Sequence, residues 1–123
     1  MKLPLWMRGF VNAWRGLRLA FATERSFRIQ AAFAVVILVA VASLPLQTWE
    51  RVVLLLAIGS VLVLELLNST VERLVDLFKP RLNVYVKDIK DIMAATVLVA
   101  ALTALAVGVV VLRPYVSLVA SLV

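Results

Sequence analysis

The chain contains no cysteine and no histidine among its 123 residues. These absences exclude disulfides, thiolate nucleophiles, imidazole general bases and the usual zinc ligands. Glycine is also scarce, and Gly9, Gly16, Gly59 and Gly108 are too dispersed to form a P-loop or a dinucleotide-binding fingerprint. Any catalysis by this chain must therefore use carboxylates, amides, hydroxyls, lysine or arginine.

Apolar residues are abundant. They make up 64% of the chain, against 16% charged residues, and the mean hydropathy is +1.07. Soluble domains average about 45–50% apolar and about 25% charged residues. Residues 29–49 and 92–112 carry no charge, and each run is long enough to cross a hydrocarbon core of about 30 Å. We predict a single-domain, all-α membrane protein over residues 1–123, with spans at about 29–48, 52–71 and 92–112.

The first residues form a different pattern. Aromatic and leucine side chains recur every three or four positions, at Trp6, Phe10, Trp14, Leu17 and Phe21. The arginines of this segment lie mainly off that stripe, which is typical of a helix that lies in the headgroup plane. We therefore predict an amphipathic surface helix over about residues 4–22. A purely structural anchor without chemistry is the alternative interpretation.

Basic residues are distributed unevenly around the predicted spans. Six precede the first span, and only Arg51 lies in the first loop. The second loop holds Arg73, Lys79, Arg81, Lys87 and Lys90. Because lysine and arginine collect on the cytoplasmic side, the amino terminus and the second loop are predicted to be cytoplasmic. With the apolar excess, a pI near 10.6 indicates anionic headgroups and nucleotide phosphates as partners, and we expect no nucleic-acid partner.

The second span contains polar groups in register. Glu65, Asn68, Glu72 and Asp76 stand at i, i+3, i+7 and i+11, so they line one face of a helix. An ionisable side chain inside a span costs about 2.5–3.5 kcal/mol on insertion scales and marks a functional candidate. Carboxylate oxygens are also ligands that Mg²⁺ favours, usually together with nucleotide phosphates. This stripe is therefore the leading candidate site.

A structural interpretation of the stripe stays open. The acids could hold helices together or pair with Arg28 and Arg73. Two further groups are predicted at the same membrane level: Glu24 near the first span, and a charged cluster before the third. That cluster consists of Lys87, Asp88, Lys90 and Asp91. A solvated helix start is the simpler interpretation of the cluster, with Lys87 and Asp91 spaced for a surface ion pair.

These segments resemble the bacterial integral-membrane diacylglycerol kinase and undecaprenol kinase family. The resemblance is carried by the run from Glu65 to Asp76, by Lys90-Asp91 leading into residues 94–98, by residues 14–20 and by residues 24–28. It covers roughly residues 8–112. The resemblance implies a homotrimer in the bacterial cytoplasmic membrane, with active sites between subunits. It also implies transfer of the γ-phosphate of MgATP to diacylglycerol or to undecaprenol, a choice that the sequence leaves open.

The resemblance also implies roles for individual residues. Glu24 and Glu72 would hold Mg²⁺, Glu65 would be the general base, Asn68 would position the reacting groups, and Lys90 would contact phosphate. The ATP-binding set is Arg8, Glu24, Glu72, Asp76, Lys90 and Asp91. The lipid-substrate region is Ser26, Phe27, Arg28, Glu65 and Ala94.

The chain departs from the family pattern near its start. Leu5 stands where relatives carry a basic residue, and Arg8, one turn later, is expected to replace it. A non-enzymatic function is the competing hypothesis: a small transporter subunit or scaffold that uses the acidic stripe as a cation or proton relay. Such a protein would not need Lys90 or Glu24 beside the stripe.

Overall fold

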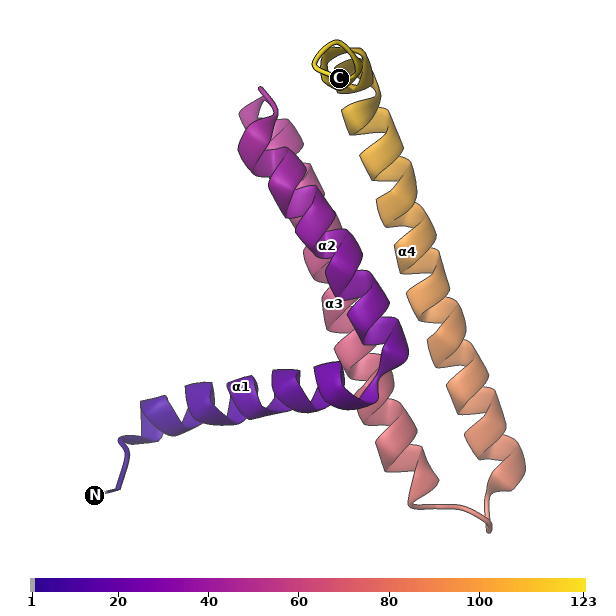
Figure 1. Ribbon diagram of the computed structural model, residues 1–123. Helices are drawn as coiled ribbons and strands as arrows, with labels where there is room; N and C mark the ends of the chain where they lie inside the picture. The colour runs from indigo at the N-terminus through magenta and orange to yellow at the C-terminus, as the bar shows by residue number, and fades with distance from the viewer. Residues whose placement is uncertain (1) are drawn as a thin grey trace.

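The computed structural model describes residues 2–123, which form four α-helices and no strand (Figure 1). The helices are α1 (Leu5–Thr23), α2 (Arg25–Ser43), α3 (Thr48–Asp76) and α4 (Asn83–Ala120). α3 packs against both α2 and α4, whereas α1 leaves the other helices at a steep angle. Helices α2, α3 and α4 are each long and apolar enough to cross a membrane. The prediction of an all-α protein with three helices able to span a membrane is confirmed.

The first span ends earlier than predicted. We predicted residues 29–48, but α2 runs from Arg25 to Ser43, and the backbone at Leu44 is extended. Pro45 explains the early end, because proline disfavours helical backbone at the preceding residue and has no amide N–H to donate. The uncharged run therefore includes a connection, and α3 begins at Thr48.

The other two long helices extend beyond their predicted spans. α3 continues past residue 71 to Asp76, and α4 starts before residue 92, at Asn83, and ends after residue 112, at Ala120. At about 1.5 Å per residue these helices are about 44 and 57 Å long, more than a hydrocarbon core of about 30 Å requires. The predicted spans stopped where each apolar run ends. The backbone hydrogen bonds of both helices continue into the charged residues beyond.

A one-residue elbow joins α1 to α2. Glu24 alone separates the two helices, and its backbone is extended, with φ −110° and ψ 108°. The bounds of α1 agree with the predicted 4–22 to within one residue. Its aromatic side chains Trp6, Phe10 and Trp14 are mostly exposed. Contact of this helix with the membrane surface stays a prediction.

Few apolar side chains are buried within the chain. A small core of Leu46, Leu54 and Val111 lies at the end of the long helices away from the elbow. Large apolar residues along the long helices, such as Leu56 and Val110, are exposed. A hydrocarbon solvent covers such surfaces without cost, whereas water does not, so the exposure fits a multi-pass membrane protein.

A buried carboxylate lies beside this core. Glu50, in the first turn of α3, is 8% exposed and accepts hydrogen bonds from the Tyr115 hydroxyl at 2.6 Å and the Gln47 backbone N–H at 2.8 Å. These contacts tie the start of α3 to the end of α4. Nothing in the sequence pattern singled out Glu50, because its partner is 65 residues away.

Candidate active site

Two predicted site carboxylates lie where α2 begins beside α3. Glu65 of α3 is only 4% exposed, and its Oε2 accepts a hydrogen bond from Ser26 Oγ of α2 at 3.1 Å. Glu24, in the elbow, accepts a hydrogen bond at Oε1 from Ser69 Oγ of α3 at 3.0 Å. Glu65 therefore meets α2 at Ser26, and Glu24 meets α3 one turn beyond Glu65, at Ser69.

Two arginines fix the elbow around these acids. Arg73 forms an ion pair with Glu24 at 3.3 Å and donates to Thr23 Oγ1 at 2.8 Å. Arg28 donates to the carbonyls of Phe21 and Ala22, at the end of α1. Within residues 2–123, neither arginine forms an ion pair with an acid of the stripe on α3. They stabilise the turn between α1 and α2.

The charged end of the stripe meets α4. Asp76 Oδ1 lies 2.6 Å from Lys90 Nζ and 3.4 Å from Lys79 Nζ. The Lys90 contact joins the last residue of α3 to the second turn of α4. Lys87 and Asp91 form the surface ion pair expected from their spacing, at 3.5 Å. Asp76 and Lys90 are thus brought together, while Asp91 is engaged on its own helix.

Asn68 and Glu72 lie on α3 between these two groups. Glu72 is half-buried. The amide oxygen of Asn68 is buried and has no hydrogen-bond partner within residues 2–123. A buried acceptor without a partner is uncommon in folded proteins and is often found where a ligand binds. The stripe is therefore a continuous polar path from the buried Glu65 to the exposed ion pair.

The carboxylates fit a magnesium ion that arrives with a nucleotide. Within residues 2–123, no three Asp or Glu side chains are gathered closely enough to hold a metal by themselves. Mg²⁺ is usually bound through one or two carboxylates plus substrate phosphates, and Glu24 and Glu72 supply that kind of oxygen donor. The donor chemistry is therefore suitable for Mg²⁺ bound to a nucleotide.

Three predicted site residues lie outside this cluster. Arg8 is near the free end of α1, about 24 Å along the helix from Glu24 at 1.5 Å per residue, and donates to the carbonyl of Leu3. Phe27 is buried, and Ala94 is exposed on α4. Their predicted roles stay predictions.

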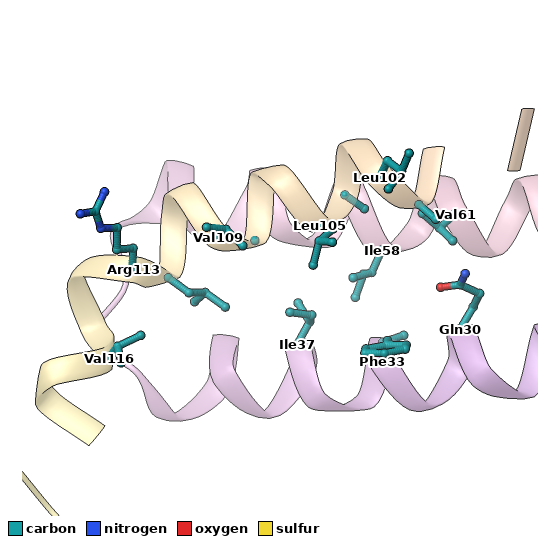
Figure 2. A pocket seen from close by; sticks show the side chains of 15 residues that line it. Gln30, Phe33, Ile37, Ile58, Val61, Leu102, Leu105, Val109, Arg113 and Val116 are labelled. Carbon is teal, nitrogen blue, oxygen red and sulfur yellow. The ribbon is translucent and has the colours of Figure 1, made fainter. Parts of the chain in front are cut away.

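An apolar groove begins one turn from the site. It has a volume of about 620 Å³ and lies between α2 and α4, with α3 behind it (Figure 2). Figure 2 shows Phe33, Ile37 and Leu105 along the groove, with Gln30 at one end and Arg113 at the other. In a membrane, hydrocarbon chains or a neighbouring helix must fill such a groove, and its lining fits either one.

Ser69 was missing from the sequence-based assignment, although a signal for it was present. It stands four residues after Glu65, so it falls on the same face of α3 as the acids. Ser26 was assigned only to the lipid region, and its contact with Glu65 depends on how α2 and α3 are placed side by side. Sequence periodicity describes one helix and does not give that placement.

Comparison with known proteins identifies relatives of this chain. Residues 11–112 match the family model described as prokaryotic diacylglycerol kinase. The chain is 38% identical to a diacylglycerol kinase of Synechocystis over 112 residues, which cover 90% of this chain and 64% of that protein's length. It is 33% identical to the undecaprenol kinase of Bacillus subtilis over 113 residues, 92% of each chain.

A third relative has a similar sequence identity to this chain. The diacylglycerol kinase of Escherichia coli strain K12 is 34% identical over 93 residues, 75% of each chain. The matched region of the family model contains Glu24 of the elbow and Glu65, Glu72 and Asp76 of α3, together with Lys90. The chain belongs to the prokaryotic diacylglycerol kinase family, a family of membrane lipid kinases.

Proposed function

We propose that this protein transfers the γ-phosphate of ATP to the hydroxyl group of a membrane lipid alcohol, at the polar stripe of α3. The observation that carries the proposal is the buried Glu65, held by Ser26 one turn from Glu24 and continuous with the exposed Asp76–Lys90 pair. A lipid hydroxyl arrives from the bilayer and ATP from water. The stripe has one end suited to each substrate.

The reaction needs a general base for the lipid hydroxyl and positive charge near the transferred phosphate. Glu65 takes the proton of the lipid hydroxyl as the oxygen attacks the γ-phosphorus, the bond from phosphorus to the ADP oxygen breaks, and ADP leaves. A carboxylate acts as a general base when it lies within hydrogen-bond reach of the proton that it takes. The buried oxygen of Asn68 can accept a hydrogen bond from the same hydroxyl and so orient it.

Phosphoryl transfer depends mainly on alignment and charge neutralisation. Bound between Glu24, Glu72 and the phosphates, Mg²⁺ would neutralise the negative charge of the transferred group. Lys90 supplies a positive charge at the aqueous end of the stripe, and Asp76 holds that ammonium in place before the nucleotide binds. Asp91 and Arg8 are the remaining predicted nucleotide contacts.

The orientation follows from the same arrangement. We place α1 on the cytoplasmic surface and the loop between α3 and α4 in the cytoplasm of a bacterium, because the basic residues gather there. The polar stripe of α3 gains from protein neighbours, and a homotrimer with shared sites supplies them. All 123 residues act as one domain in this proposal.

The acceptor is either diacylglycerol or undecaprenol, the substrates that the names of the relatives indicate. Purified protein incubated with labelled ATP, Mg²⁺ and each lipid alcohol in turn is expected to transfer label into the organic phase with one of them. Equal amounts of both alcohols in one assay then measure the preference. Absence of lipid-bound label with both alcohols and with a bacterial lipid extract would contradict a kinase function and favour the relay hypothesis.

A further inference from the structure

The carboxylates of the site are held by two serine hydroxyls that cross the same helix interface in opposite directions. Ser26 of α2 donates to Glu65 of α3 at 3.1 Å, and Ser69 of α3 donates to Glu24, the residue before α2, at 3.0 Å. Each helix therefore contributes one acid and one hydroxyl. We call these two contacts the serine clamp.

The two contacts of the serine clamp can form together in only one placement of α2 along α3, because of the spacing of their residues. The donor and acceptor are two residues apart on the α2 side and four residues apart on the α3 side. If α2 slid along α3 by one turn, about 5.4 Å, both hydrogen bonds would break together. Arg73 of α3 also meets Glu24, at 3.3 Å, across the same interface. The clamp and this ion pair together are the polar links that set the depth of α2 against α3.

Each hydroxyl also selects an oxygen of its acid. Ser26 occupies Oε2 of Glu65, and within the described part of the chain no hydrogen bond reaches Oε1. That second oxygen is the one that can accept the proton of a lipid hydroxyl. Ser69 meets Oε1 of Glu24 on the side where Arg73 also binds, which leaves Oε2 for another ligand.

We infer that Ser26 and Ser69 are positioning residues of the kinase site: Ser26 orients Glu65 toward the lipid hydroxyl, and Ser69 orients Glu24 toward the nucleotide. Neither residue transfers a proton or touches phosphate. This inference rests on the proposed lipid kinase function. It adds that the two hydroxyls act on different steps although they lie on one interface.

The test compares alanine and threonine at both positions. Because Ser26 serves the chemical step, Ser26→Ala is expected to lower kcat about tenfold and leave the KM for MgATP within about twofold of the original value. Because Ser69 serves nucleotide binding, Ser69→Ala is expected to raise the KM for MgATP about tenfold with a smaller change in kcat. Ser26→Thr and Ser69→Thr keep the hydroxyl and are expected to restore most of each loss.

Ser60→Ala is the matched control. Ser60 lies on α3 as well, but it is exposed and donates only to the carbonyl of Leu56 on its own helix, at 2.7 Å. Both kinetic constants should be unchanged in this variant. If Ser26→Ala and Ser69→Ala behave like Ser60→Ala, the positioning role is wrong while the kinase function stands. An inactive original protein and an inactive Ser60→Ala variant would instead contradict the proposed function itself.

A stability measurement separates positioning from misfolding. Glu65→Leu, Ser26→Ala and the double variant are unfolded by heat in the same detergent, because leucine removes the acceptor of the Ser26 hydroxyl. If the hydroxyl contacts the carboxylate, the Tm change of the double variant will be smaller than the sum of the two single changes. Strict additivity would mean that the contact is not formed in the membrane protein, and it would overturn the inference whatever the kinetic results.

Discussion

Glu65 and Glu72 stand two turns apart on α3 and have different surroundings. Glu65 is almost fully buried and has a hydroxyl partner, whereas Glu72 is half-buried beside it, nearer the charged end of the helix. A carboxylate that is removed from water suits proton transfer, and one that is partly exposed suits a hydrated cation. Their roles can be separated by changing each to the neutral amide of the same shape.

Glu72→Gln is expected to lower the rate of ATP-dependent lipid phosphorylation by about 10²–10³-fold, because the site loses a negative ligand for the magnesium of MgATP. The change removes no contact that holds the helices together, so the Tm in detergent should be nearly unchanged. The measurement is label transfer into lipid, with the Tm as its control. Retained activity would show that Glu72 does not hold the metal.

Glu65→Gln is expected to lower kcat by about 10²–10⁴-fold, the range of a lost general base. Binding of MgATP should persist, because Glu65 lies at the lipid end of the stripe. Isothermal titration with a slowly hydrolysed ATP analogue and Mg²⁺ checks this separation. A loss of nucleotide binding together with turnover would mean that Glu65 is needed for the structure of the site.

At the scale of elements, the ends of α3 and α4 are joined by an ion pair between exposed side chains. Asp76 and Lys90 are half-exposed and partly exposed, respectively, and lie 2.6 Å apart. Surface pairs contribute little to stability because water and salt screen them. The pair therefore matters for placing Lys90 near the stripe more than for holding the fold.

Exchanging the two charges tests this interpretation. The double change Asp76→Lys with Lys90→Asp keeps an ion pair between the same helices, so the Tm in detergent should stay close to that of the original protein. Kinase activity should nevertheless fall as far as it does in Lys90→Met, because an acid now faces the phosphates. Recovery of activity in the exchanged protein would show that only the pairing matters.

The helices themselves were predictable, and their ends were not. Uncharged runs long enough to cross a bilayer predict spans, and the i, i+3, i+7 and i+11 spacing correctly predicted that Glu65 and Asp76 share one helix. Pro45 ended α2 inside a run that hydropathy treats as continuous. The serine contacts could not be predicted, because they depend on the register between two helices, which the periodicity of either one leaves undetermined.

At the scale of the whole molecule, one chain leaves much of its apolar surface uncovered. Val36, Leu56 and Val110 are more than half exposed, and the site lies along α3 between the elbow and the loop to α4. Lipid can cover the apolar surface, but the half-buried acids of α3 gain more from protein neighbours. This favours the predicted assembly of several copies around α3.

The protein is therefore expected to form a trimer in detergent. Light scattering combined with size-exclusion chromatography should give a protein mass three times that of the 13.5 kDa chain after subtraction of the detergent. Dilution that dissociates the assembly should abolish activity. A fully active monomer would contradict both the trimer and the sharing of sites between subunits.

Because only one residue separates α1 from α2, we expect kinase activity to depend on the thickness of the bilayer. α1 is predicted to lie along the surface and α2 crosses the hydrocarbon, so a change in the tilt of α2 must be absorbed at Glu24, the residue between them. Tilt responds to hydrophobic mismatch between a helix and its lipid. Kinase activity in vesicles should therefore pass through a maximum as the acyl chains are lengthened, and insertion of two glycines after Thr23 should flatten that dependence while lowering the peak.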